Sequence, residues 1–61
     1  MTALPAIGKP ATRALAALGI NTLEAAADLG EKALLAQHGI GPKAVRILRE
    51  TLAAEGKELK P

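Results

Sequence analysis

The chain has 61 residues, contains no cysteine and no Phe, Trp or Tyr, and carries a formal net charge of +2. A chain of this length forms one small domain, or part of one, with a modest core, which argues against a metabolic enzyme with a deep pocket. The missing cysteines exclude a disulfide framework, a thiolate zinc site and a cysteine nucleophile, and the missing aromatic rings exclude base stacking on aromatic platforms.

The first predicted helix follows a lead-in, residues 1–9, that ends in a glycine turn. Pro10 suits the first turn of a helix, where a missing N–H leaves no hydrogen bond unmade. Gly19 is expected to end this helix in the left-handed conformation, with the apolar Ile20 after it. The apolar residues of its predicted buried face follow a helical spacing: Ala11, Ala14, Leu15 and Leu18.

Two short helices are predicted next, over residues 23–29 and residues 31–37, with Gly30 between them. Either Asn21 or Thr22 can cap the first of these helices, because a short polar side chain accepts a hydrogen bond from an unpaired helical N–H. The side chains of the second helix that are expected to point inward are Leu34 and Leu35.

The longest predicted helix follows the tight turn of residues 39–41 and runs from Pro42 to about Glu55. Gly56 is expected to end it, and residues 57–61 are expected to form a frayed tail. The apolar residues of its predicted buried face are Ala44, Ile47, Leu48 and Leu52, with Val45 on the flank. With 14 Ala and 10 Leu against one Val and no strand-like alternation, the sequence predicts an all-α, compact bundle of four to five short helices.

The chain also contains an internal repeat with an offset of 33 residues. Residues 7–15 align with residues 40–48, and Ile, Gly, Ala, Arg and Leu coincide at five of the nine positions. We interpret this as two copies of one unit, in which a glycine turn leads into a helix.

The two turns have a chemical consequence, because each delivers the backbone into a helix N-terminus. We name them the first glycine turn (residues 6–9) and the second glycine turn (residues 39–43). The first N–H groups of a helix have no intrahelical acceptor, and the helix dipole adds positive potential there. Glycine leaves room for an anion such as phosphate to approach these donors. The cations at or near the two turns are Lys9, Arg13, Lys43 and Arg46.

The charges are sorted along the chain in a way that fits this interpretation. Residues 1–20 carry a net charge of +2, residues 21–38 carry −2 and residues 39–49 carry +3. Positive charge therefore gathers at the turns, which is typical of a surface that meets a polyanion. The acids of the intervening segment are expected to form a solvated face: Glu24, Asp28 and Glu31.

Residues 33–48 resemble the second hairpin of a helix-hairpin-helix domain. The hallmark of that family is Gly-apolar-Gly followed by Ala three residues on, and here it reads Gly39-Ile40-Gly41 with Ala44. Residues 4–11 resemble a degenerate first hairpin of the same kind.

The likeness extends over residues 4–56. Residues 19–24, Leu34-Leu35 and Gly41-Pro42-Lys43 are similar to the C-terminal domain of the bacterial RNA polymerase α subunit. The resemblance implies a tandem helix-hairpin-helix fold with a pseudo-twofold axis, in a single domain over residues 1–56. Its parts are hairpin one at about residues 4–19, a connector at 20–30 and hairpin two at 31–56, followed by the tail.

The resemblance further implies a module that binds the backbone of double-stranded DNA across a minor groove, largely independently of sequence. The family's phosphate-binding positions correspond to Gly39, Gly41 and Lys43 in hairpin two, and to Gly8 and Lys9 in hairpin one. The full set of predicted DNA-binding residues is Gly8, Lys9, Arg13, Gly39, Gly41, Lys43 and Arg46. The module is expected to be non-enzymatic and cytoplasmic, associated with the nucleoid where it binds DNA. No cofactor is expected, although a monovalent cation at a hairpin carbonyl stays open.

An alternative is a protein-interaction or scaffold module that keeps the fold without binding DNA, either with another protein or by self-association. Ala6 replaces the first glycine of hairpin one, and Pro10 stands where the polymerase domain has an Arg that enters the minor groove. Together with the modest charge of +2, these departures favour the alternative. Neither interpretation involves a membrane, because no apolar run approaches the length of about 18 residues that a spanning helix needs.

Overall fold

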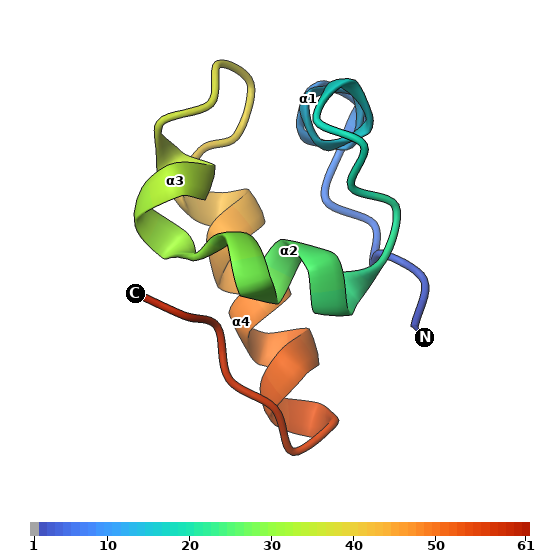
Figure 1. Ribbon diagram of the computed structural model, residues 1–61, viewed down its shortest axis with the longest axis vertical. Helices are drawn as coiled ribbons and strands as arrows, with labels where there is room; N and C mark the ends of the chain where they lie inside the picture. The colour runs from blue at the N-terminus through green and yellow to red at the C-terminus, as the bar shows by residue number, and fades with distance from the viewer. Residues whose placement is uncertain (1) are drawn as a thin grey trace.

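The computed structural model describes residues 2–61, and four helices account for most of them (Figure 1). The helices are α1 (Lys9–Ala17), α2 (Leu23–Leu29), α3 (Glu31–Leu35) and α4 (Pro42–Ala54). The described residues contain no strand, only an isolated bridge between Ala3 and Thr22. The radius of gyration is 9.9 Å, close to the value of about 10.5 Å for a folded chain of this length. The predicted all-α compact bundle is confirmed, with four helices.

Helix α2 begins and ends where the sequence predicts. The hydroxyl oxygen of Thr22 accepts a hydrogen bond from the N–H of Ala25 at 3.2 Å, so Thr22 and not Asn21 is the capping residue. Gly30 separates α2 from α3 with a φ of 97°, a conformation that L side chains rarely adopt. Helix α3 is shorter than predicted and ends at Leu35.

Helices α1 and α4 end in the same way. After α1, Gly19 has a φ of 76° and the N–H of Ile20 donates to the carbonyl oxygen of Leu15 at 2.9 Å. After α4, Gly56 has a φ of 70° and the N–H of Lys57 donates to the carbonyl oxygen of Leu52 at 2.8 Å. Both endings are the left-handed glycine stop that the sequence predicts.

The core combines residues from all four helices with one isoleucine from each glycine turn. Ile7 and Ile40 are 8% and 4% exposed, and each holds its turn against the core. The fully buried large side chains are Leu15, Leu23, Leu34, Leu48 and Leu52.

Two predicted core leucines lie outside the core. Leu18 is 45% exposed because α1 ends at Ala17 and the chain then turns to bring Ile20 inward instead. Leu35 is 43% exposed because it follows the fully buried Leu34, and adjacent residues of a helix point about 100° apart.

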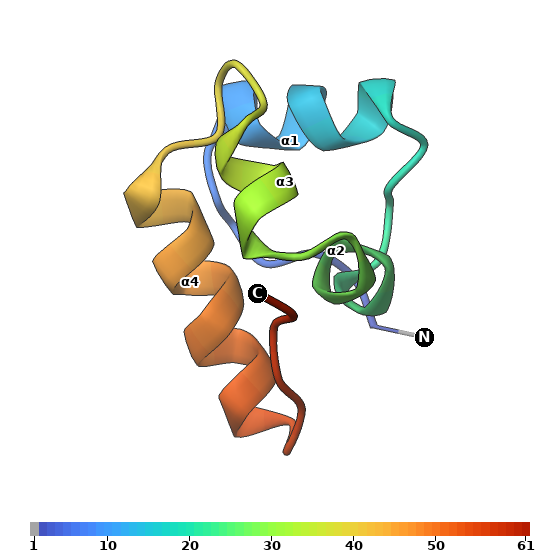
Figure 2. The same ribbon diagram turned by 60° about the vertical axis from the view of Figure 1, so that its left-hand side comes forward.

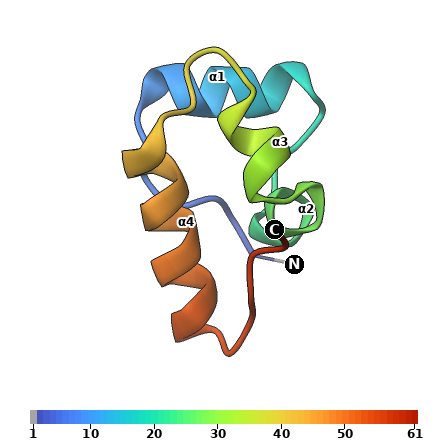
Figure 3. The ribbon, with the colours of Figure 1, turned by 90° about the vertical axis from the view of Figure 1, so that its left-hand side faces the viewer.

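The expected frayed tail is also wrong. Residues 57–61 turn back after α4 and run beside α2 toward the start of α3 (Figures 1 and 3). Leu59 packs against the core, and the backbone of Lys60 hydrogen-bonds to both Ala27 and Glu31. The sequence pattern near the tail does not indicate this docking, because the partners of the segment lie about 30 residues earlier in the chain.

Helix α1 crosses the end of the bundle at which α4 begins (Figures 2 and 3). The N-termini of α1 and α4 therefore lie at the same end of the molecule, together with the glycine turns that precede them.

Candidate nucleic-acid interface

The two glycine turns meet at a single surface hollow of about 330 Å³. Its lining includes Gly8 from the first glycine turn and Gly39, Gly41 and Lys43 from the second. The second glycine turn contacts the first turn of α1, because a Cβ placed on Gly39 would lie 3.0 Å from the carbonyl oxygen of Pro10. We call this space the shared hollow.

The helix N-termini beside the shared hollow carry unpaired amide donors. The first intrahelical hydrogen bonds of α1 and α4 are from the N–H of Thr12 to Gly8 and from the N–H of Val45 to Gly41. The amides before them have no acceptor in the helix, and within residues 2–61 none is provided by another segment. Because Pro10 and Pro42 have no N–H, the donors are the amides of Lys9, Ala11, Lys43 and Ala44.

These two N-termini differ from that of α2. Neither α1 nor α4 has a side-chain cap or an acidic residue in its first turn. Helix α2 has both, with Thr22 as the cap and Glu24 in the first turn. The positive potential of the helix dipole is therefore left uncompensated only where the longer helices approach the shared hollow.

The three predicted glycines have different backbone roles. Gly8 and Gly39 have φ values of 95° and 96°, so their conformations favour glycine. Gly41 has a φ of −103° and a ψ of 179°, an extended conformation that any residue adopts. The backbone at position 41 therefore does not require glycine, and the positive φ falls at non-equivalent positions of the repeat. A Cβ on Gly41 would meet no atom within 4 Å, so this glycine leaves open space.

Three predicted cations surround the two turns. Lys43 lines the shared hollow, and Lys9 and Arg13 line a second hollow of about 500 Å³ that also includes Ala6 and Gly8. The two hollows adjoin, since both are lined by Ala6 and Gly8. All three cations are exposed, and none forms an ion pair within residues 2–61.

Arg46 lies apart from this group. Its Nε lies 3.5 Å from a carboxylate oxygen of Glu50 one turn further along α4, and it lines neither hollow. The structure therefore brings together six of the seven predicted residues and leaves out Arg46.

The acids of the connector lie at the surface, as the sequence predicts, and each of them is also ion-paired. Glu24, Asp28 and Glu31 pair with Lys57, Lys60 and Arg49, respectively. These partners lower the pKa of Glu24 and of Asp28, and the hydrogen bond from Lys57 is the largest cause at Glu24. The same bond raises the pKa of Lys57.

This pairing concentrates the remaining charge. Within residues 2–61 the cations outside ion pairs are Lys9, Arg13, Lys32 and Lys43, and the acids outside ion pairs are Glu55 and Glu58. Three of the four cations lie at the glycine turns or within one helical turn of them, and the two acids follow the C-terminal end of α4. The molecule is thus polarised, with its positive end at the shared hollow.

Sequence reasoning missed the amides of Ala11 and Ala44 as donors. The signal for them is positional, because each is the third residue after the glycine that precedes its helix. It also missed Ile47, which lines the shared hollow although its spacing placed it in the core.

Residues 2–61 hold no group of three or more His, Cys, Asp or Glu side chains placed to share a metal ion. None of the helices in that range combines the length and the apolar character needed to cross a bilayer. Comparisons of the chain with protein-family models, with curated proteins and with solved structures give no match.

Proposed function

We propose that the protein is a small non-enzymatic module that binds the phosphate backbone of double-stranded DNA. The observation that carries this proposal is the shared hollow, where two uncapped helix N-termini and the unpaired Lys43 converge. Backbone amides at a helix N-terminus and a lysine are suited to an anion with several oxygen acceptors. A tandem helix-hairpin-helix arrangement related to the polymerase α domain is part of the proposal.

The donors favour binding without sequence preference. Backbone amides and lysine side chains that contact phosphate fix the position of a protein on DNA but do not read bases. The chain has no aromatic residue on which unpaired bases could stack, which favours a duplex over a single strand. We place the two turns on opposite strands across a minor groove, which is only about 6 Å wide. That residues of both turns line one hollow supports this placement.

The expected affinity is modest because few phosphates are neutralised. Two to three phosphate contacts predict a slope of log K against log salt of about −2 to −3, and a Kd of about 10⁻⁴ to 10⁻⁶ M. Anisotropy titrations of a labelled duplex at about 50 and 200 mM salt measure both quantities. We expect binding to weaken by about 15- to 60-fold over this range.

The variant Lys43→Glu tests the site within the same titration. It is expected to abolish measurable binding. Lys32→Glu is the control, because it makes the same change of charge on α3, outside both hollows. Equal losses in the two variants would assign the binding to net charge alone. Absence of binding by the unaltered protein at 50 mM salt would end the proposal.

A protein-interaction module is the second candidate, and the exposed Leu18 and Leu35 favour it. Contiguous apolar patches mark contacts between proteins, so this candidate requires the two leucines to share one surface. Sedimentation of the protein without DNA separates this candidate from the first, because concentration-dependent self-association that Leu35→Lys removes would support an interaction surface.

A further inference from the structure

Residues 57–61, which we call the strap, connect the end of α4 to the junction of α2 and α3 (Figures 1 and 3). Lys60 makes the central contact through its backbone. Its N–H donates to the carbonyl oxygen of Ala27 at 3.3 Å, and its carbonyl oxygen accepts from the N–H of Glu31 at 2.6 Å. Lys60 thus bridges the last turn of α2 and the start of α3.

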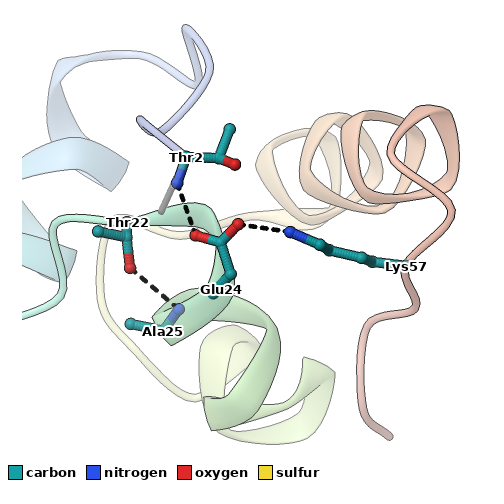
Figure 4. A network of polar contacts seen from close by, with 5 residues as sticks. All are labelled: Thr2, Thr22, Glu24, Ala25 and Lys57. Atoms are coloured by element: carbon teal, nitrogen blue, oxygen red, sulfur yellow. Dashed lines mark hydrogen bonds and ion pairs between the residues drawn. The ribbon is translucent and has the colours of Figure 1, made fainter.

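Two side-chain ion pairs add to this backbone contact. Lys57 Nζ lies 2.6 Å from Glu24 Oε2, and Lys60 Nζ lies 2.7 Å from Asp28 Oδ1. The other oxygen of Glu24 accepts from the N–H of Thr2 at 2.8 Å, so one carboxylate contacts both ends of the described chain (Figure 4). The pairs are open to solvent, with the Lys60 and Asp28 side chains 64% and 75% exposed. Exposed pairs of this kind are weak and are screened by salt.

The strap contributes little to the core. Leu59 is its one apolar side chain packed on the core, and every fully buried large side chain lies in a helix. Gly30 accommodates the strap, because a Cβ there would lie 2.7 Å from the carbonyl oxygen of Pro61. The strap can therefore leave its place without opening the hydrophobic interior.

We propose that the strap is a salt-sensitive clasp that opens and closes as a unit while the four helices stay folded. A segment with one half-buried apolar side chain, two backbone hydrogen bonds to its dock and two exposed ion pairs belongs to the least stable part of a fold. Opening releases the Glu24 and Asp28 carboxylates from their ion pairs and the amide of Glu31 from its hydrogen bond. Ionic strength thereby controls whether these two acids are paired.

Amide exchange with water, measured by NMR on the full chain, tests the clasp directly. The N–H of Glu31 is protected by the strap alone, and the N–H of Lys60 is protected only by its dock. Raising salt from about 50 mM to 1 M is expected to accelerate both exchange rates by about fivefold, the effect of screening two exposed pairs. The amide of Leu48, inside α4, is the reference for the helices and is expected to stay unchanged.

Two matched variants locate the cause. Lys60→Gln removes the pair with Asp28 and is expected to accelerate exchange of the Glu31 amide about twofold at low salt. Glu58→Gln also changes one charge of the strap, but Glu58 forms no ion pair within the described chain, and no acceleration is expected. The proposal is overturned if Glu31 exchanges only together with Leu48, if salt leaves its exchange unchanged, or if the two variants behave alike.

Discussion

Gly39 lies directly against Pro10, close enough that a Cβ on Gly39 would come within 3.0 Å of the proline carbonyl oxygen. This contact joins the second glycine turn to the first turn of α1, although the two residues are far apart in the sequence. It explains why two separate glycine turns line one hollow, and it makes the geometry of that hollow sensitive to a single methyl group.

Gly39→Ala is expected to destabilise the protein by about 1–3 kcal/mol, because a side chain at a φ of 96° is strained and its Cβ would lie 3.0 Å from the carbonyl oxygen of Pro10. Thermal unfolding followed by circular dichroism checks this. A loss of this size lowers the Tm by about 4–8 °C for each kcal/mol. Gly41→Ala is the matched control, and we expect a change within about 0.5 kcal/mol because its extended backbone suits alanine. Equal effects at the two positions would contradict the assigned backbone roles.

Gly41→Asp is expected to raise stability and to remove DNA binding at the same time. Gly41 has the extended conformation of a capping residue, so an aspartate there can accept from the α4 amides and stabilise the helix by about 0.5–1 kcal/mol. The same carboxylate would occupy the donors proposed for phosphate. Unfolding and duplex titration of one preparation give both results. A stabilised variant that still binds DNA would show that these amides are not the contact.

Lys43→Gln is expected to reduce the salt slope of DNA binding by about one, because one phosphate contact is lost. Lys32→Gln removes the same charge from α3 and is expected to leave the slope unchanged. Titrations of both variants over several salt concentrations provide the comparison. If the two slopes fall equally, Lys43 acts only through the net charge of the protein.

The Glu24 contacts predict a loss of stability at low pH. Its pKa lies well below the ordinary value of 4.5, because Lys57 and the N–H of Thr2 stabilise the carboxylate. A carboxyl group whose pKa is lower in the folded state than in the unfolded state stabilises the protein. This contribution is fully present above the unfolded-state pKa and is lost as the pH falls through the folded-state pKa. The pKa of Lys57 is raised in the folded state. The stabilisation by its charged ammonium group is therefore fully present below pH 10.5 and is lost as the pH rises through the folded-state pKa.

Urea unfolding of the protein and of Glu24→Gln as a function of pH measures this contribution. We expect the unaltered protein to be the more stable at neutral pH, with a difference that shrinks as the pH falls below about 4.5. Glu58→Gln serves as the control, since Glu58 forms no ion pair within residues 2–61. A difference that persists at low pH would mean that Glu24 acts through packing and not through its charge.

Features set by local chemistry could be predicted from the sequence. Thr22 and Gly30 bound α2, and Gly19 and Gly56 stop the two longer helices, because capping and left-handed glycine depend on a few adjacent residues.

Features set by contacts between distant residues could not be predicted. Nothing near Lys60 indicates that Ala27 and Glu31 are its partners, so the docked strap was expected to fray. The repeat suggested equivalent turns, yet Gly8 has a φ of 95° and its counterpart Gly41 has a φ of −103°. The pairing of Arg46 with Glu50 follows from their spacing of four residues. The sequence does not show, however, that Arg46 is absent from the lining of the shared hollow.

The most direct test of the account is an NMR titration of the amide groups with a short DNA duplex at low salt. We predict that the donor amides of Lys9, Ala11, Lys43 and Ala44 shift together and saturate at one DNA concentration, while amides of the strap do not move. Shifts confined to one turn, or centred on the exposed leucines, would contradict a joint phosphate site at the meeting of the two helices.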